Sequence, residues 1–223
     1  MSTELKGRTF NIVGGDNLVL RMMEGFGCIP KPDIASSEIV IFTGGADVSP
    51  VMYGQTALPC TSTNPSRDKI EAQIFGQSGL RLKAGICRGG QFLNVVNGGS
   101  MWQDVDNHGR SHTLRYYMKS GAEREVLVTS THHQMMRRHI PKSILWAGAG
   151  ETSFKSDCWT TQKMAMKHYM DEEIVYYPGT RSLCFQPHPE YGNADCRDLF
   201  GEALVRALEY NPPKEIDWPS AVI

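Results

Sequence analysis

Short apolar runs alternate along the chain with longer segments in which apolar residues recur every three or four positions. The short runs indicate buried strands, and several of them stop abruptly at a pair of glycines. We predict strands within residues 8–15, 37–45, 82–86, 173–177 and 182–188. We predict helices within residues 17–27, 67–80, 91–97 and 194–210. Strands that alternate with helices in this way favour an α/β fold with a mostly parallel sheet flanked by helices.

The middle of the chain follows a different pattern. Residues 113–118 and 124–130 are short stretches of alternating character, which indicates a small antiparallel extension of the sheet. Residues 46–66 are rich in Pro, Gly, Ser and Thr and indicate a loop. No repeat, low-complexity block or long linker interrupts the sequence, so we expect one domain over residues 1–223.

Composition narrows the choice of partner and compartment. Apolar residues make up 40% of the 223 positions and charged residues 21%, with a formal net charge of −1. This balance gives no electrostatic reason to expect nucleic acid or an anionic membrane as partner. The first residues contain no apolar signal segment, and no apolar run is long enough to span a bilayer. We therefore expect a cytoplasmic protein.

The six cysteines are scattered along the chain, and none forms a Cys-x-x-Cys pair. This spacing argues against a zinc site or a dense disulfide framework. Nothing in the sequence indicates a metal ion or an organic cofactor, so we expect neither.

One cysteine stands where a strand is predicted to meet a helix. Cys87 lies at the centre of a Gly-x-Cys-x-Gly sequence, residues 85–89. A nucleophile in such a sharp turn needs neighbours without bulky side chains, and the turn aims it at the first N–H groups of the helix. Those groups favour thiolate over thiol, and the N–H of Arg88 points where an oxyanion would form. A buried structural cysteine is the alternative, but the flanking glycines favour the nucleophile.

A thiolate needs a base, and His188 at the end of a predicted strand is the best placed histidine. Glu190 lies two residues further on. If the chain stays extended there, both side chains lie on one face, and the carboxylate can hold the imidazole in the right tautomer for Cys87. The prolines on both sides of His188 suit a sheet edge or a strand end.

The sequence "GICRGGQ" at residues 85–91, followed about a hundred residues later by "HPE", resembles the class I glutamine amidotransferase superfamily, also grouped as the gamma-glutamyl hydrolases. The resemblance implies a flavodoxin-like α/β sheet and a Cys-His-Glu triad. Cys87 would be the nucleophile, His188 the general base and acid, and Glu190 the residue that orients the histidine.

The same resemblance implies an oxyanion hole and a substrate contact. The N–H of Arg88 and the N–H of Gly45, from the Gly-Gly turn after an earlier strand, would form the oxyanion hole. Gln91 would contact the gamma-glutamyl group. The implied partner is a small-molecule gamma-glutamyl substrate or glutamine.

Five further stretches are similar to the branch that contains gamma-glutamyl-gamma-aminobutyrate hydrolase. They cover residues 44–54, 67–71, 87–105, 107–112 and 128–134. Departures from that branch bear on substrate identity more than on chemistry: the chain is shorter, the region 102–128 is abbreviated, and Gln186-Pro187 replaces the usual Gln-Trp before the histidine.

The other histidines have several possible roles. His132 and His133 follow a strand-like run, and they either line the acyl or leaving-group pocket or form a polar strand end. His108 and His112 have metal-like spacing only in a helix, and Gly109 argues against a helix there. We expect those two in a loop or behind the site.

Three more residues receive weaker expectations. Glu71 either supports the site from its helix or belongs to a solvated helix face. His139 and His168 are expected at the surface.

The main hypothesis is cysteine-dependent hydrolysis of a gamma-glutamyl amide through a thioester on Cys87. A second hypothesis keeps this chemistry but makes the chain the glutaminase subunit of a two-protein amidotransferase, which passes ammonia to a separate synthetase. A third, from a different class, is a catalytically inactive binding or regulatory module, against which the intact Cys, His and Glu argue.

Overall fold

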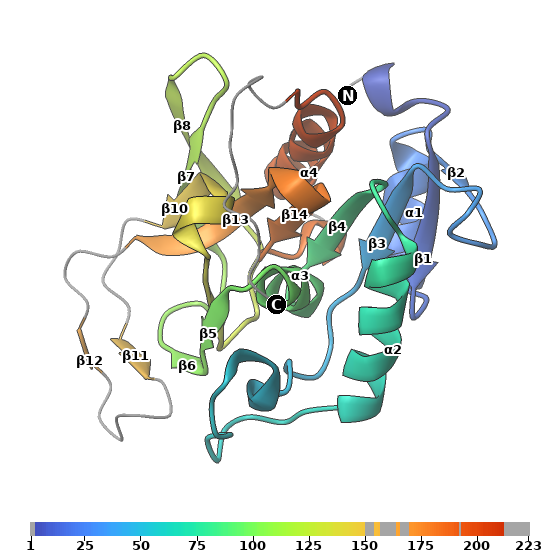
Figure 1. Ribbon diagram of the computed structural model, residues 1–223. Helices are drawn as coiled ribbons and strands as arrows, with labels where there is room; N and C mark the ends of the chain where they lie inside the picture. The colour runs from blue at the N-terminus through green and yellow to red at the C-terminus, as the bar shows by residue number, and fades with distance from the viewer. Residues whose placement is uncertain (1–2, 150–153, 157–163, 166–169, 192, 212–223) are drawn as a thin grey trace.

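The computed structural model describes residues 3–149, 154–156, 164–165, 170–191 and 193–211. Within these residues an 11-stranded mixed sheet forms the centre of the molecule (Figure 1). Its main path runs in the order β2 (Ile29–Pro30), β1 (Thr9–Val13), β3 (Ile39–Phe42), β4 (Leu82–Ile86), β14 (Ser182–Phe185), β13 (Asp171–Tyr177), β10 (Ile144–Ala149), β7 (His112–Tyr117) and β8 (Glu123–Val128).

The remaining elements attach to this path. Strand β9 (Met135–Arg137) pairs with β13 and with β5 (Ser100–Trp102), and a smaller sheet joins β12 (Met164–Ala165), β11 (Phe154–Ser156) and β6 (Asp104–Val105). The α-helices are α1 (Asn17–Gly25), α2 (Pro65–Gln77), α3 (Arg88–Val96) and α4 (Ala194–Leu208). Short 3-10 turns are η1 (Thr3–Leu5), η2 (Pro50–Tyr53), η3 (Ile140–Lys142), η4 (Pro178–Thr180) and η5 (Pro189–Tyr191).

The sheet has a parallel half and an antiparallel half that meet at β14. Strands β2, β1, β3, β4 and β14 are parallel neighbours, whereas β14, β13, β10, β7 and β8 pair antiparallel. The predicted α/β fold class is therefore confirmed, but the sheet is mixed rather than mostly parallel, because the antiparallel part is larger than the small extension expected. The predicted antiparallel stretches 113–118 and 124–130 form the hairpin of β7 and β8.

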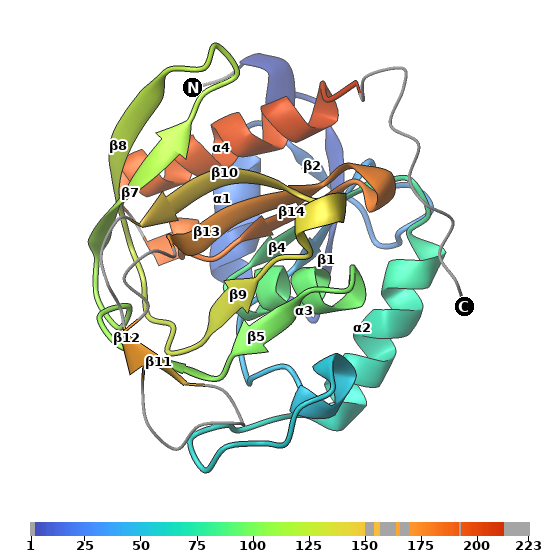
Figure 2. The same cartoon turned by 60° about the vertical axis from the view of Figure 1, so that its left-hand side comes forward.

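The apolar runs of β3, β4 and β14 are buried on both faces, as the absence of a polar alternation predicts. In β3, Ile39 and Ile41 pack into a core that contains residues of α1 and α4. Val40 and Phe42 pack into the opposite core, which contains residues of α3. Helices α1 and α4 thus cover one face, and α3 and α2 cover the other (Figures 1 and 2).

Helix α3 begins at Arg88, three residues before the predicted start at position 91, and so includes Gly89 and Gly90. Glycine is needed at both helical positions because α3 lies closer to the sheet than a residue with a Cβ would allow. A Cβ at Gly89 would overlap the Phe42 carbonyl, and one at Gly90 would lie 2.9 Å from the Phe185 nitrogen. The glycines therefore serve the contact between helix and sheet rather than a turn.

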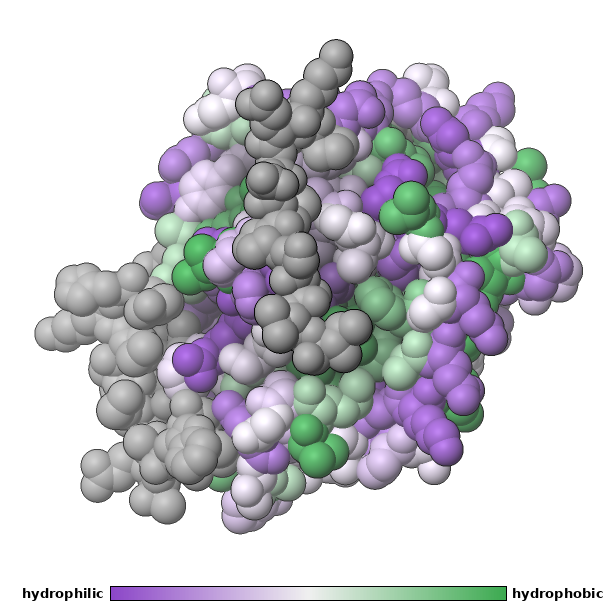
Figure 3. Space-filling model, viewed as in Figure 1, coloured by the Kyte–Doolittle hydropathy of each residue, from purple (hydrophilic) through white to green (hydrophobic). Residues whose placement is uncertain are grey.

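Three further observations concern the helices, the surface and the cysteines of the described residues. None of these helices is both long and apolar enough to cross a bilayer. On the face shown in Figure 3, hydrophilic and hydrophobic residues are interspersed, and hydrophilic ones line the edge that α2 forms. The described cysteines are all free thiols: Cys28, Cys60, Cys87, Cys184 and Cys196.

We expect Gly89→Ala to destabilise the protein by roughly 1–3 kcal/mol or more, because the new methyl group forces α3 away from β3. Gly76→Ala is the matched control, since Gly76 is an exposed position of α2 where a Cβ would have no other atom within 4 Å. That change should stabilise the protein by roughly 0.5–1 kcal/mol through helix propensity. Urea unfolding midpoints measure both, and equal midpoints for the two variants would contradict the close approach.

Candidate active site

Cys87 sits in a sharp turn between β4 and α3. Its φ of +51° lies in the left-handed region, where a residue other than glycine costs on the order of 1–3 kcal/mol unless its surroundings hold it. The Cys87 N–H donates to the Phe185 carbonyl of β14 at 2.8 Å, which fixes the turn to the sheet. A Cβ at Gly85 would overlap the backbone of Gly89, so the turn can be this tight only with glycine there. The predicted elbow is therefore present.

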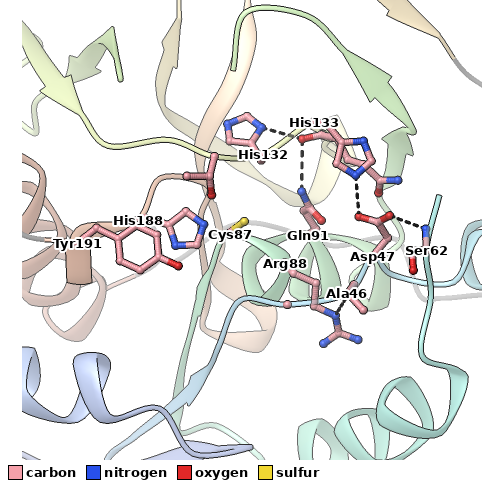
Figure 4. Close-up of a pocket in the computed structure, with 13 residues that line it drawn as sticks. Ala46, Asp47, Ser62, Cys87, Arg88, Gln91, His132, His133, His188 and Tyr191 are labelled. Atoms are coloured by element: carbon pink, nitrogen blue, oxygen red, sulfur yellow. Dashed lines mark hydrogen bonds and ion pairs between the residues drawn. The ribbon is translucent and has the colours of Figure 1, made fainter. Parts of the chain in front are cut away.

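His188 follows the neighbouring strand β14 and lies beside Cys87, with Tyr191 on its other side (Figure 4). The rings of His188 and Tyr191 stack with centroids 4.6 Å apart. The His188 backbone N–H donates to the Thr129 carbonyl at 2.8 Å. His188 Nδ1 lies 2.7 Å from Glu190 Oε1, which leaves the other ring nitrogen for Cys87.

The backbone reaches this arrangement by a different route from the expected one. The chain does not stay extended after His188; instead Pro189–Tyr191 form the 3-10 turn η5. Proline cannot continue the ladder of β14, and the turn folds Glu190 back onto the imidazole. The pairing of His188 with Glu190 holds, although the extended geometry expected for it does not.

The charge state of His188 follows from its neighbours. Burial by itself disfavours the imidazolium, but hydrogen bonding to Cys87 and to the Glu190 carboxylate outweighs it and raises the pKa of His188 to about 10. At neutral pH the ring is therefore a buried imidazolium next to the cysteine. Such a group can stabilise a thiolate and can donate a proton.

Arg88 supports the site through its side chain, which points away from Cys87 (Figure 4). The guanidinium is buried and pairs with two carboxylates of α2, Asp68 and Glu71. It also donates to the Ala46 carbonyl at 3.1 Å. Burial lowers the pKa of Arg88 to about 10, so the group stays charged at neutral pH and depends on these partners.

The same network holds the Gly-Gly turn that follows β3. Arg67 binds Glu71 at 2.7 Å and donates to the carbonyls of Thr43 (2.9 Å) and Gly44 (2.8 Å). Gly45 has a φ of +136°, and the Arg67 guanidinium occupies the space that a Cβ at Gly45 would fill. Of the two roles that the sequence left open for Glu71, the structure shows the buried, supporting one.

Cys87 and His188 open onto a pocket of about 370 Å³. The predicted oxyanion-hole residues Gly45 and Arg88 line it, as do the predicted substrate residues Gln91, His132 and His133. The other lining residues are Ala46, Asp47, Ser62, Thr131, Gln134 and Tyr191. The sequence-predicted residues are thus brought together at one pocket, with Glu190 behind His188.

The predicted substrate residues differ in their surroundings. Gln91 is buried, and its amide donates to the carbonyl of Gln134 (3.3 Å) and to the side chain of Gln186 (3.4 Å). His133 is 46% exposed and lies 3.2 Å from Asp47. The hydrogen bond to Asp47 raises the pKa of His133.

Sequence reasoning missed Asp47, which also accepts a 2.8 Å bond from the Ser62 N–H. Its position in the 44–54 stretch was the available signal. His139, expected at the surface, is half-buried, and its backbone N–H donates to the Tyr177 hydroxyl at 3.0 Å. His168 lies outside the described residues.

The Peptidase C26 family model matches residues 33–151, more than half of the 223 residues, so the chain belongs to the Peptidase C26 family. This membership supports a hydrolase or amidotransferase enzyme. NtpR of Enterococcus hirae is 31% identical over 140 residues, which cover 51% of this chain and 59% of NtpR. YvdE of Lactococcus lactis, a candidate glutamine amidotransferase-like protein, is 34% identical over 97 residues, or 42% of this chain and 39% of YvdE. In both comparisons the match spans less than two thirds of the relative's length.

A solved structure supports the fold over nearly the whole chain. It is that of a candidate GMP synthase subunit from Thermoplasma acidophilum, with a TM-score of 0.60 and 16% sequence identity. The similarity covers 90% of this chain and 94% of that one.

We expect Glu71→Gln to lower the free energy of unfolding by on the order of 3 kcal/mol, because it leaves buried guanidinium charge uncompensated. Glu202→Gln is the matched control: Glu202 pairs with Arg124 at the surface, where an ion pair contributes at most about 1 kcal/mol. Chemical denaturation measures both variants. A Glu71→Gln protein as stable as Glu202→Gln would show that the buried network does not hold the site together.

Proposed function

We propose that the protein is a cysteine-dependent amidohydrolase that cleaves gamma-glutamyl amides. The observation that carries the proposal is a chain of contacts: Cys87, at the start of α3, contacts His188, and His188 contacts Glu190. Membership of the Peptidase C26 family and the fold support it.

The proposed reaction begins with attack of the Cys87 thiolate on the side-chain carbonyl carbon of the gamma-glutamyl group. The negative charge that develops on the carbonyl oxygen faces the N–H groups of Arg88 and Gly45. Arg88 is the first residue of α3, so its N–H has no partner within the helix. When the C–N bond breaks, the His188 imidazolium gives its proton to the leaving amine and a thioester remains.

Hydrolysis then uses the same groups in reverse. His188, now neutral, takes a proton from water as the water oxygen attacks the thioester carbonyl. The C–S bond breaks, glutamate leaves, and the thiolate–imidazolium pair is restored. Glu190 keeps the ring orientation through both steps because its contact with Nδ1 does not change.

The polar lining of the pocket suits an amino-acid substrate. Asp47 and His133 place a carboxylate and a cation-forming imidazole at the mouth, beside buried Gln91. We assign to these groups the recognition of the alpha-amino and carboxylate ends of the substrate. The resemblance of several stretches to the gamma-glutamyl-gamma-aminobutyrate hydrolase branch favours a leaving amine that itself carries a carboxylate.

We expect 6-diazo-5-oxo-norleucine, a glutamine-derived electrophile, to form a single adduct on Cys87, located by mass spectrometry. Cys87→Ala should give no adduct and should reduce turnover of gamma-glutamyl amides by roughly 10³-fold or more. The control is Cys60→Ser, which removes an exposed thiol and should still be labelled. Full activity in Cys87→Ala would refute the mechanism.

The same experiment separates a free-standing hydrolase from a glutaminase that needs a partner. Turnover by the isolated protein supports the free-standing hydrolase. Glutamine turnover that stays at background until a second protein is added would instead support the two-protein amidotransferase. An adduct-free Cys87 that still reacts with iodoacetamide would show that the pocket does not accept a glutamyl group.

We expect the alkaline limb of the kcat/KM profile to fall near pH 10, where His188 loses the proton that it donates to the leaving amine. Because a carboxylate favours the imidazolium, Glu190→Gln should move this limb to lower pH by roughly 1–3 pH units. Glu209→Gln, at an exposed position after α4, should leave it in place. An unshifted limb in Glu190→Gln would mean that the carboxylate does not control His188.

A further inference from the structure

Three histidines converge on one buried carboxylate behind the pocket wall. His108 Nδ1 and His112 Nε2 each lie 3.2 Å from Glu173 Oε1, and His132 Nε2 lies 3.6 Å from the same atom. Glu173 is fully buried in β13, and His108 and His132 are only 3% exposed. The proposed chemistry at Cys87 uses none of His108, His112 and Glu173.

Each imidazole has its other ring nitrogen against an oxygen acceptor. His108 Nε2 lies 2.9 Å from Asp171 Oδ2, His112 Nδ1 lies 3.3 Å from the Arg110 carbonyl, and His132 Nδ1 lies 2.8 Å from the Gln134 carbonyl. When these outer nitrogens carry the protons, the inner nitrogens present lone pairs to Glu173 Oε1. Outer acceptors of this kind fix the tautomer of metal-binding histidines.

Two of the inner nitrogens and one carboxylate oxygen lack hydrogen bonds. Among the described residues, His108 Nδ1, His132 Nε2 and Glu173 Oε2 are buried side-chain atoms with no hydrogen-bond partner. Buried polar atoms without partners are rare because each loses its water without replacement.

Two of the protonation states leave the cluster poorly balanced. His108 and His132 stack at 4.8 Å, so charging both rings puts two cations in contact. Leaving all three rings neutral instead turns lone pairs toward the Glu173 carboxylate. Charging His108 alone sets its two N–H groups against Asp171 and Glu173, and this state is the alternative to a bound ion. A divalent cation between His108, His112 and Glu173 gives both inner nitrogens a partner and offsets the carboxylate charge.

We propose that His108 Nδ1, His112 Nε2 and the Glu173 carboxylate bind a zinc ion. Zinc lies about 2.0–2.2 Å from nitrogen and oxygen ligands, so tetrahedral ligand atoms stand about 3.4 Å apart. Each of the two nitrogens lies 3.2 Å from Glu173 Oε1, which fits this spacing. Two imidazoles and one carboxylate suit zinc better than magnesium or calcium, which prefer oxygen ligands.

Three protein ligands leave one position for a water, and His108 and Glu173 are buried. The ion would join the loop before β7, the first residue of β7 and strand β13. His132, which lines the pocket, stacks on His108, so the ion would hold one wall of the active site to the antiparallel half of the sheet.

The expectation of no metal rested on cysteine spacing and on Gly109 between His108 and His112. Gly109 does exclude a helix, but the two rings meet edge-on with centroids 4.7 Å apart without one. Glu173 comes from a distant part of the sequence, so no local spacing could reveal the set.

The test is the zinc content of the purified full-length protein, measured by mass spectrometry after dialysis, together with thermal melting with and without a chelator. We expect one zinc per chain, a lower melting temperature after chelation, and recovery when zinc is added back. His112→Gln removes a ligand, so its affinity for zinc should fall. The fall should exceed the roughly 10–100-fold loss that follows when only the hydrogen-bond partner of a ligand is removed. His112 is the ligand nearest the surface, with its side chain 14% exposed, so this variant is the least disruptive.

A rival group at the pocket rim, formed by Cys60, Asp104 and His133, provides the control. Cys60→Ser should keep its zinc. Cobalt in the chelated protein should give visible absorption without a thiolate charge-transfer band, and this readout decides the question even if His112→Gln fails to fold. Zinc lost in Cys60→Ser, a thiolate band, or neither binding nor a chelator effect in the native protein would each overturn the proposal.

Discussion

The buried guanidinium of Arg88 is the interaction on which the site depends. This residue directly follows the nucleophile, so its backbone belongs to the first turn of α3 while its side chain reaches α2. A charge so deeply buried is stable only with its partners in place, and those partners are Asp68 and Glu71. Through Arg67, Glu71 also holds the turn at Gly45. The elbow and the loop opposite it are therefore fixed to a common anchor.

Glycine provides the second constraint. In the sharp turn at Cys87, and where α3 approaches the sheet, backbone atoms occupy the space that the Cβ of any residue other than glycine would fill. These contacts bring the N-terminal end of α3 under the sulfur, where N–H groups favour negative charge. The helix, the strand ends and the histidine can then act on the same atom.

Much of the fold and the site could be predicted from the sequence because their signals are local. The elbow is a run of a few residues, and His188 and Glu190 are two positions apart, so proximity did not depend on tertiary structure. Their extended geometry was wrong because Pro189 favours a turn where the strand ends. The helix was expected to begin only after the glycines at 89 and 90, because the sequence explained a glycine there by the turn and does not show that a helix contacts a sheet.

Contacts between distant segments could not be predicted in this way. Asp47 and His133 meet across the pocket, and His108, His132 and Glu173 come from two loops and a strand that are far apart in the sequence. Hydrophobic periodicity identifies which residues are buried, but it does not show which polar residues lie opposite one another. His139, expected at the surface and found half-buried, shows the same limit.

The order of strands has one more consequence. Gly45, Cys87 and His188 follow β3, β4 and β14, which are adjacent in the sheet although about a hundred residues separate β4 from β14 in sequence. Between α3 and β13 the chain builds most of the antiparallel half of the sheet, which for the three strand ends that carry the site is an excursion. Such an arrangement lets lineages lengthen, shorten or replace that excursion, and so change which molecule is admitted, while the reacting groups keep their places.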